Sequence, residues 1–334
     1  MTKKEKNHAY ALLLALCATC IAFQGCGNGS FVKISGYAQG GVYSVKCRIP
    51  ATGMKQARAN AESLKSGIDS ILNVIDYAVS GYNDSSVLSI YNRGGDISSC
   101  RQECLKVFDA MTVFADSIAA ATSGVVDTRA AALFDIWGFG FQNDTLPSDD
   151  MVAAAMDDRS RMNFNAVAQG FSSDLIAGYL RGNGIYDFLV DIGGEMICDG
   201  RNPHGKNWTF AIDTPSDGNM TPGRDISGIF EVTRRPCAVV TSGNYRKFYI
   251  RDGVKYSHTI DPRTGYPVQH NLLSATIIAP TAALADAMAT YCMVIGPDAA
   301  GEFISSRNDL EGCLISSDGI WTSDGLTLKT NEGR

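Results

Sequence analysis

The chain has 334 residues, of which 45% are hydrophobic and 19% are charged. That composition is ordinary for a globular protein, and the length is sufficient for a sizeable core in one large domain or two closely joined ones. The formal net charge is -6, and no long segment concentrates lysine and arginine. The sequence therefore lacks the basic footprint of a nucleic-acid-binding protein, and we expect no nucleic-acid partner.

The first 25 residues have the pattern of a secretion signal. MTKKEKNHAY is basic, and the apolar stretch ALLLALCATCIAF is too short for a comfortable membrane span. The following Phe-Gln-Gly-Cys resembles a bacterial lipobox, in which Cys26 becomes the lipidated first residue. A simple secretory signal or an uncleaved anchor are the alternatives. We expect a signal peptide over residues 1–25, a tether over 26–33 and a folded domain over 34–334, lipid-anchored on a periplasm-facing membrane of the bacterial cell envelope.

Seven cysteines remain after the lipobox, and an odd number leaves at least one of them unpaired. Their spacing shows no Cys-x-x-Cys pair and no dense disulfide framework, and the ligands of a zinc site are missing. Cys100 and Cys104 could pair, or could lie one helical turn apart. Cys198, Cys237 and Cys292 lie in apolar segments, so we expect them in the core.

The N-terminal half of the folded part begins with a strand or hairpin and continues mainly with helices. Residues 34–49 alternate and are punctuated by glycine, which predicts the hairpin. Apolar residues at helical spacing predict a helix over 55–79, and a second helix follows over 103–122. The stretch SGYNDSSVLSIYN between them is polar and rich in turn residues. Shorter helices are expected over 149–160 and from about 171 to 181.

The C-terminal half is dominated by strand-like runs. YDFLVDIGGEMICDG is a strand with a Gly-Gly break, further runs are WTFAID, SGIFEVT, CAVVTSG and LLSATIIA, and CLISSDGIWTSDGLTL is a closing pair. Thr281 is placed to cap a helix that runs to about Ile295. Because several strands follow one another without a helix, we expect an α+β fold with a largely antiparallel sheet and packed helices.

Familiar motifs for phosphate binding and hydrolysis are absent. The sequence has no Gly-x-x-x-x-Gly-Lys-Ser/Thr loop, no Gly-x-Gly-x-x-Gly between a strand and a helix, no His-Glu-x-x-His and no Gly-x-Ser-x-Gly elbow. The candidates for chemistry are therefore polar residues at the ends of apolar elements.

Asp286 and Thr290 are four residues apart on an otherwise apolar helix, so both point the same way. A carboxylate among Ala, Met, Leu and Val is costly unless it is paired or bound to a cation. Carboxylate and hydroxyl are hard oxygen donors that suit Mg²⁺. Alternatively, Asp286 makes a cap or a salt bridge, and Thr290 bonds the carbonyl four residues back.

Two further segments are candidates for a site. In KYSHTIDPRTGYP, Pro262 and Gly265 force a tight turn that could present His258, Asp261 and Thr264 to a cleft. NFNAVAQG opens a helix, whose unpaired N–H groups could receive an anion. A surface turn and a plain helix entry are the ordinary alternatives.

Together these segments resemble one family, the ApbE-type FAD:protein FMN transferases. The likeness covers about residues 36–296 and has five motifs in the family's order. They are GYAQGGVYSV; SGYNDSSVLSIYN; SGVVDTRAAALFDIWGFG; NFNAVAQGFSSDLIAGYL with FLVDIGGEMICDG; and VVTSGNYRKFYIRDGVKYSHTIDPRTGYP with ADAMAT. The fold it implies is the ApbE-like, T-fold-related architecture.

The resemblance implies that FAD is bound as a substrate with Mg²⁺ on its pyrophosphate. A threonine hydroxyl of an acceptor protein attacks the FMN phosphorus, and AMP leaves. The implied metal ligands are Asp286, Thr290 and the carbonyl of Ala166. His258 or Asp261 would take the proton, and we favour His258. The implied FAD contacts are Ser80, Asn83, Asp127, Thr128, Trp137, Asn163, Gln169, Thr241, Ser242, Gly243, His258 and Thr264.

The sequence departs from the family pattern at two positions. An aspartate and a lysine of the family's central block are replaced by Asn163 and Gln169. The simultaneous loss of both signs indicates an ion pair replaced by amide hydrogen bonds, and it leaves one cation fewer near FAD.

The resemblance implies acceptors such as subunits of the RNF complex or of the sodium-pumping NADH:quinone reductase. Two other functions stay open at this point. One is an FAD pyrophosphatase, with water in place of the acceptor. The other is a non-catalytic flavin-binding lipoprotein, which would bind FAD without releasing AMP.

Overall fold

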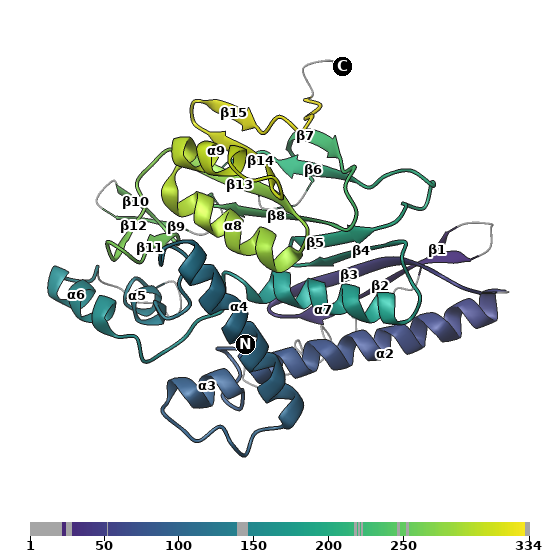
Figure 1. Ribbon diagram of the computed structural model, residues 1–334, viewed down its shortest axis with the longest axis horizontal. Helices are drawn as coiled ribbons and strands as arrows, with labels where there is room; N and C mark the ends of the chain where they lie inside the picture. The colour runs from purple at the N-terminus through teal and green to yellow at the C-terminus, as the bar shows by residue number, and fades with distance from the viewer. Residues whose placement is uncertain are drawn as a thin grey trace, which may run out of the picture.

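A computed structural model gives the arrangement of the chain (Figure 1). It describes residues 22–24, 29–51, 53–138, 146–216, 219, 221, 223–245, 248–251 and 254–330. The predicted lipidation site at Cys26 and most of the predicted signal peptide lie outside these ranges. Within them, no helix is both long enough and apolar enough to cross a bilayer.

One large sheet forms the centre of the fold. In the described part of the chain it has nine strands in the order β1-β2-β3-β4-β5-β8-β13-β14-β15, and every neighbouring pair is antiparallel. These strands are β1 Ala22–Gln24, β2 Ser30–Ala38, β3 Gly41–Ile49, β4 Phe188–Ile192, β5 Glu195–Asp199, β8 Cys237–Gly243, β13 Leu272–Ala279, β14 Glu311–Ser316 and β15 Gly319–Thr322. The predicted α+β class with a largely antiparallel sheet is confirmed.

Smaller ribbons and the helices complete the fold. The ribbons pair β6 Thr209–Asp213 with β7 Ile226–Glu231, β9 Phe248–Arg251 with β10 Val254–Ser257, and β11 Ile260–Asp261 with β12 Tyr266–Pro267. The helices are α2 Met54–Val79, α3 Val87–Asn92, α4 Gln102–Ala121, α5 Ala131–Ile136, α6 Asp149–Asp157, α7 Ala168–Gly182, α8 Ala282–Ile295 and α9 Pro297–Ser305.

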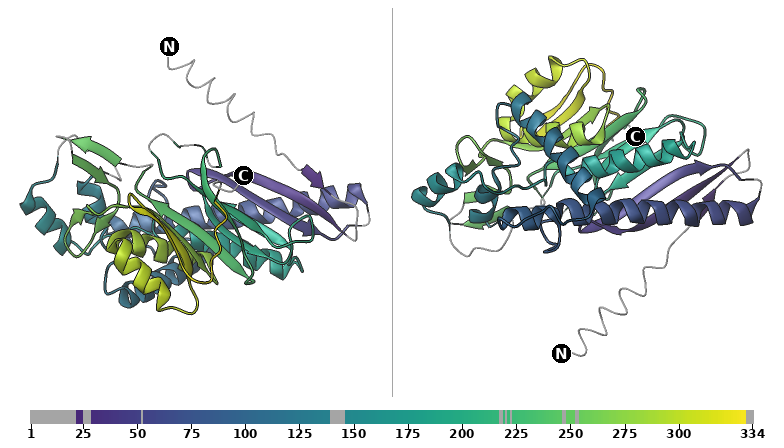
Figure 2. Two further views of the ribbon diagram at one scale, coloured as in Figure 1. Left: turned by 90° about the horizontal axis from the view of Figure 1, so that it is seen from above. Right: turned by 60° about the horizontal axis from the view of Figure 1, so that its bottom comes forward.

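The two faces of the sheet are covered by different elements. In β8, Ala238 and Val240 belong to the main core, which the sheet forms with α2, α7 and α8. Cys237 and Val239 point to the other face, into a second cluster shared with β6 and β7. This alternation follows from the two-residue period of a strand. Figure 1 shows the three core helices on one side of the sheet, and Figure 2 shows the same layering from two further directions.

Most predicted elements are confirmed, with shifted ends. The helices predicted over 55–79 and 103–122 differ from α2 and α4 by a single residue at their ends, and Thr281 caps α8 as expected. However, α7 begins at Ala168 and α6 ends at Asp157, each three residues earlier than predicted. Helices α3, α5 and α9 are not predicted; α3 and α5 have only six residues each, too few turns to establish a period.

The tether predicted over residues 26–33 is wrong from Ser30 onward. Ser30 pairs with Ile49 at the start of β2, and the next residues, Phe31 and Val32, are buried. Their apolar side chains pack on opposite faces of the sheet, so this segment is a strand. Strand β1 lies inside the predicted signal peptide and pairs with β2.

The seven cysteines of the described part are all free. Cys100 and Cys104 are therefore unpaired; Cys104 lies in the first turn of α4, and Cys100 lies two residues before the helix begins. Cys198, Cys237 and Cys292 are buried in apolar clusters, as predicted.

Antiparallel pairing gathers several turns at one end of the sheet. The β2–β3 turn closes where Ala38 pairs with Gly41, and the β4–β5 turn closes at Gly193 and Gly194. Strand β8 ends at the same side with Gly243. Strands β9 to β12 and helices α5 and α6 lie beyond this end (Figure 1).

Candidate functional site

The start of α8 is held by side chains from two elements. Thr281 Oγ1 accepts a hydrogen bond from the Leu284 N–H at 3.3 Å. The carboxylate of Asp174, on α7, accepts from the N–H groups of Ala282 at 2.8 Å and Ala283 at 2.9 Å. The first turn of a helix leaves such donors unpaired, and a carboxylate also meets the positive end of the helix dipole. Helix α7 thereby fixes where α8 begins.

Helices α7 and α8 approach each other most closely at Gly170. A Cβ at this position would lie 2.4 Å from the carbonyl oxygen of Ala282, so only glycine fits the crossing. The Gly170 N–H donates to Asp286 Oδ2 at 3.1 Å. Because α7 begins at Ala168, the carboxylate of Asp286 lies at the positive, N-terminal end of that helix.

Asp286 is a buried carboxylate that has no cationic partner among the residues that the structure describes. Its exposed fraction is 5%, and within the described residues its one polar contact is the hydrogen bond from Gly170. Burial raises the pKa of Asp286, and the negative charge of Asp174 adds to the rise, against a smaller lowering by the Gly170 hydrogen bond. Such a carboxylate needs a positive charge beside it to be ionised at low cost.

The oxygen donors around Asp286 fit Mg²⁺. Thr290 lies one helical turn further along α8 on the same side, and Ala166 stands two residues before the first residue of α7. A carboxylate, a hydroxyl and a peptide carbonyl are hard donors, which Mg²⁺ takes together with water and phosphate oxygens. In the described residues no three His, Cys, Asp or Glu side chains cluster, so an all-side-chain metal site is absent there.

Residues 258–267 form the predicted tight turn, closed by the β11–β12 pair. Asp261 pairs with Tyr266, and the Gly265 N–H donates to the Asp261 carbonyl at 2.8 Å. Gly265 has a φ of 82°, and a Cβ there would collide with Val152 and Met156 of α6. The glycine is therefore required both by the backbone conformation and by the contact with α6.

Arg263 forms a hydrogen-bonded ion pair with the carboxylate of Asp261. The guanidinium donates to it from Nε at 3.0 Å and from Nη2 at 2.8 Å, and the Arg263 backbone N–H adds a third bond at 2.9 Å. Burial alone would raise the pKa of Asp261, but the hydrogen bonds and charge of Arg263 outweigh it and hold that pKa below its usual range. Asp261 is thus the weaker candidate for proton acceptor. Thr264 is exposed and donates to the Asp261 carbonyl at 3.3 Å.

The turn is tied to the end of β8 by one hydrogen bond. His258, directly after β10, is partly buried. The hydroxyl of the next residue, Thr259, donates to Asn244 Oδ1 at 2.5 Å, and both of these residues are buried. Asn244 directly follows β8, whose last three residues are predicted FAD contacts: Thr241, Ser242 and Gly243. The structure therefore brings His258 and these three residues together.

The loop after α2 is held in one shape by its own polar groups. Ser80 caps the C-terminal end of α2, and its backbone N–H donates a hydrogen bond to the Asp76 carbonyl at 3.1 Å. Asn83 Nδ2 donates to the Asp76 carboxylate at 2.7 Å, and its Oδ1 accepts from the Ser85 N–H at 3.0 Å. The buried Ser86 hydroxyl donates to the Ser80 carbonyl at 2.7 Å. Ser80 and Asn83 stay predicted FAD contacts on a preorganised loop.

Asp127 and Thr128 contact the segment before α7. The Asp127 carboxylate accepts from the Arg129 N–H at 2.9 Å and forms an ion pair with Arg159. The Thr128 carbonyl accepts from the Asn163 N–H at 2.7 Å. Three of the predicted FAD contacts are thus neighbours, although they come from two separate segments.

Asn163 and Gln169, for which amide hydrogen bonds in place of an ion pair are predicted, have different surroundings. Asn163 Oδ1 accepts from the Asn165 N–H at 2.8 Å, a bond within its own turn. The Gln169 side chain lies against the β4–β5 turn, where a Cβ on Gly193 would come 2.3 Å from Gln169 Nε2. No hydrogen bond joins the two amides in the described structure. Asn163 is hydrogen-bonded within its own turn, and Gln169 packs against the β4–β5 turn.

Trp137 is part of a small core rather than an exposed ring face. Its exposed fraction is 5%, and its indole N–H donates to the Gly265 carbonyl at 2.8 Å. One face stacks on Tyr256 at 5.9 Å between ring centroids, and Tyr266 meets it edge-on at 5.8 Å. In this arrangement Trp137 supports the turn of residues 258–267, and its contact with FAD stays a prediction.

Sequence reasoning missed three residues that shape the site: Asp174, Gly170 and Arg263. Asp174 and Gly170 act on a helix more than a hundred residues further along the chain, a relationship without a local sequence signal. Arg263 stands two residues from Asp261, and that spacing in a tight turn could have indicated the pair.

The fold and this site define an α+β protein with a buried carboxylate at the crossing of α7 and α8 and a histidine-bearing turn tied to the end of β8. The sequence matches the model of the ApbE family over residues 39–314, and the chain belongs to that family. This confirms the resemblance that the motifs indicate.

The sequence and the fold of this chain match those of relatives over most of the length of both chains. An FAD:protein FMN transferase of Klebsiella pneumoniae (strain 342) is 29% identical over 88% of this chain and 89% of its own. One of Escherichia coli (strain K12) is 31% identical over 79% of each chain. The solved structure of the flavin transferase ApbE from Vibrio cholerae superposes with a TM-score of 0.73 at 27% identity, covering 89% of this chain and 98% of that one.

Proposed function

We propose that this protein is an FAD:protein FMN transferase, which moves FMN from FAD to a threonine hydroxyl of an acceptor protein and releases AMP. Family membership and the names of the relatives support the activity. The observation that carries the mechanism is the buried carboxylate of Asp286, which lies at a helix N-terminus without a cationic partner in the described structure.

The reaction exchanges the phosphoanhydride bond between the two phosphates of FAD for a phosphoester bond to the acceptor. The acceptor oxygen forms a bond to the FMN phosphorus, the bond from that phosphorus to the AMP oxygen breaks, and the hydroxyl gives up its proton. Asp286, Thr290 and the carbonyl of Ala166 would hold Mg²⁺, whose charge stabilises the phosphate oxygens. The N-terminal N–H groups of α7 face the same region and favour an anion.

His258 is the proposed proton acceptor. A neutral imidazole takes a proton readily near pH 7, whereas the carboxylate of Asp261 is committed to Arg263. The bond between Thr259 and Asn244 fixes the backbone next to His258 relative to β8. This positioning is the contribution that phosphoryl transfer needs most from a protein.

We further propose that the protein is a lipoprotein of the bacterial cell envelope, anchored through Cys26 on a periplasm-facing membrane. The basic and apolar segments before the Phe-Gln-Gly-Cys sequence support this location. Acceptors would be subunits of membrane redox complexes, of the RNF or sodium-pumping NADH:quinone reductase type. A Cys26→Ala protein that still fractionates with membranes would count against the anchor.

The activity is tested with the soluble form, residues 27–334, mixed with FAD, Mg²⁺ and an acceptor domain of such a subunit. We expect a fluorescent acceptor band on a denaturing gel and one AMP per acceptor modified. AMP without a labelled acceptor would instead indicate a pyrophosphatase. FAD binding without release of AMP would indicate a non-catalytic flavin-binding protein.

A further inference from the structure

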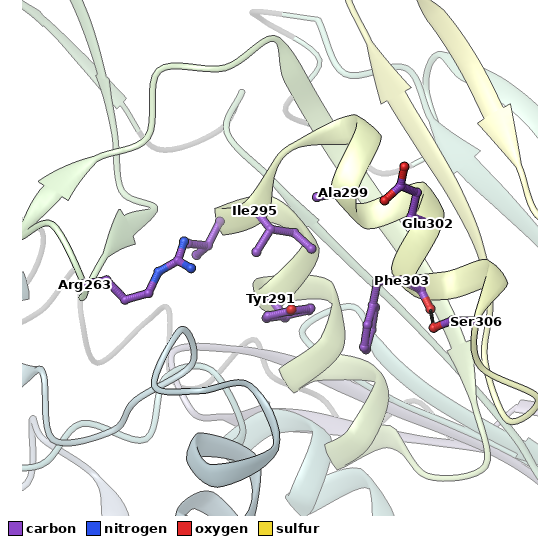
Figure 3. Close-up of a pocket in the computed structure, with 8 residues that line it drawn as sticks. Arg263, Tyr291, Ile295, Ala299, Glu302, Phe303 and Ser306 are labelled. Carbon is purple, nitrogen blue, oxygen red and sulfur yellow. Dashed lines mark hydrogen bonds between the residues drawn. The ribbon is translucent and has the colours of Figure 1, made fainter.

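A shallow groove of about 600 Å³ lies beside the catalytic turn, on a side of α8 that the proposed reaction leaves unused. The second half of α8, helix α9 and one arginine of the turn form its walls. Figure 3 shows the main lining residues: Arg263, Tyr291, Ile295, Glu302, Phe303 and Ser306. None of the predicted FAD contacts lines it.

Two residues that line the groove are neighbours of proposed site residues. Tyr291 directly follows Thr290, and the helical rotation of about 100° per residue turns its side chain toward the groove. Arg263 uses Nε and Nη2 to hold Asp261, whereas its Nη1 has no partner in the described structure. Figure 3 shows Arg263 extending to the end of the groove near Ile295. Free donors of the guanidinium are therefore available at that end.

The chemistry of the lining changes along the groove. Tyr291 and Phe303 meet edge to face, with ring centroids 4.7 Å apart, and form a partly exposed aromatic floor. Glu302 and Ser306 are exposed on α9, so the rim opposite Arg263 offers a carboxylate and a hydroxyl. One cation, an aromatic floor and one anion on an open surface suit a polypeptide segment, since a chain can enter and leave at both ends.

We propose that this groove binds an extended segment of the acceptor protein that flanks its flavin-receiving hydroxyl. A carboxylate of that segment would pair with the free donors of Arg263, an apolar side chain would pack on Tyr291 and Phe303, and a cationic or N–H group would meet Glu302. This inference rests on the proposed function, because it assigns a place to the second substrate of that reaction.

Variants on α9 test the groove kinetically in the full-length protein. Ala299→Arg fills it and Glu302→Lys reverses the charge of its rim, and both positions are exposed on a helix. The matched control is Ala59→Arg, at an exposed position of α2 outside the groove. We expect the KM for an acceptor domain of the NADH:quinone reductase type to rise about tenfold in both α9 variants, with the KM for FAD unchanged. An unchanged KM for the acceptor in both would overturn the proposal.

Amide hydrogen exchange tests binding without relying on turnover. The full-length protein is mixed with the same acceptor domain, and exchange is followed in α9 and in the first half of α2. Protection of α9 alone, lost in Ala299→Arg, is the expected result even when no FMN is transferred. Absence of that protection overturns the docking surface, as does protection that depends only on the concentration of this protein, since a second copy would then occupy the groove.

Discussion

The backbone amide of Gly170 donates a hydrogen bond of 3.1 Å to Asp286, and this contact joins the first turn of one helix to a buried carboxylate on another. The pair is possible because residue 170 has no Cβ, which would lie 2.4 Å from the Ala282 carbonyl. The proposed Mg²⁺ site is therefore built on the crossing of α7 and α8.

Replacing Asp286 with Asn keeps the shape and an acceptor for Gly170 but removes the charge. In the absence of Mg²⁺ we expect the free energy of unfolding to stay the same or to rise by about 1–3 kcal/mol, because an uncompensated buried charge is lost. Mg²⁺ should raise the melting temperature of the wild-type protein and leave that of the variant unchanged. Equal Mg²⁺-dependent shifts in both proteins would remove Asp286 from the metal site.

The pH dependence of stability follows from the raised pKa of Asp286. The folded-state pKa of Asp286 lies above its unfolded-state pKa. The contribution of Asp286 to the free energy of unfolding of the metal-free protein is therefore fully present below about pH 4, and it is lost as the pH rises through the folded-state pKa. Mg²⁺ binds the ionised form, so its stabilising effect should grow over the same range. Chemical unfolding with and without Mg²⁺, at several pH values, measures this growth. The Asp286→Asn protein should show none of it.

Gly170→Ala should disturb the crossing of α7 and α8. The added methyl group cannot fit against the Ala282 carbonyl, so we expect a loss of about 1–3 kcal/mol in the free energy of unfolding and weaker Mg²⁺ binding. Gly178 provides the control, since it lies in the same helix with nothing within 4 Å of an added Cβ. Gly178→Ala should be stabilising by about 0.5–1 kcal/mol. Similar effects at both positions would show that the close approach is unimportant.

Thr259→Val removes the hydroxyl that joins the turn to β8 and leaves a buried Asn244 oxygen without its donor. We expect the free energy of unfolding to fall by about 1–3 kcal/mol and kcat to fall with it, because His258 loses its fixed position. Urea unfolding and steady-state transfer assays measure the two effects. Thr259→Ser should restore both. A Val variant with normal kcat would mean that this bond does not position the histidine.

The sequence predicts local features of this protein better than long-range ones. The α2 and α8 boundaries follow from apolar spacing and from the Thr281 cap, and the turn at Gly265 follows from Pro and Gly. The strand at Ser30 was mistaken for a tether because a short polar and glycine-rich segment directly precedes it.

The parts of the site that the sequence does not predict depend on contacts between distant segments. Asp174 capping α8 requires the crossing of two helices, and no local pattern encodes that crossing. Trp137 illustrates the reverse case. Its residue type suits a stacking surface, yet Tyr256 and the Gly265 carbonyl take up its face and its N–H. Family motifs indicate which residues lie near the site, but the contacts of each side chain depend on its neighbours in the folded structure.

The most direct test of the central claim follows both products of the reaction in one experiment. The wild-type and Asp286→Asn proteins are incubated with FAD, Mg²⁺ and the acceptor domain, AMP is counted, and the modified acceptor peptide is sequenced by mass spectrometry. We predict FMN on a single threonine hydroxyl, in equal amount to AMP, with the wild-type protein, and neither product with the variant. FMN transfer by the variant at the wild-type rate would contradict the account, because the buried carboxylate would then have no part in the chemistry.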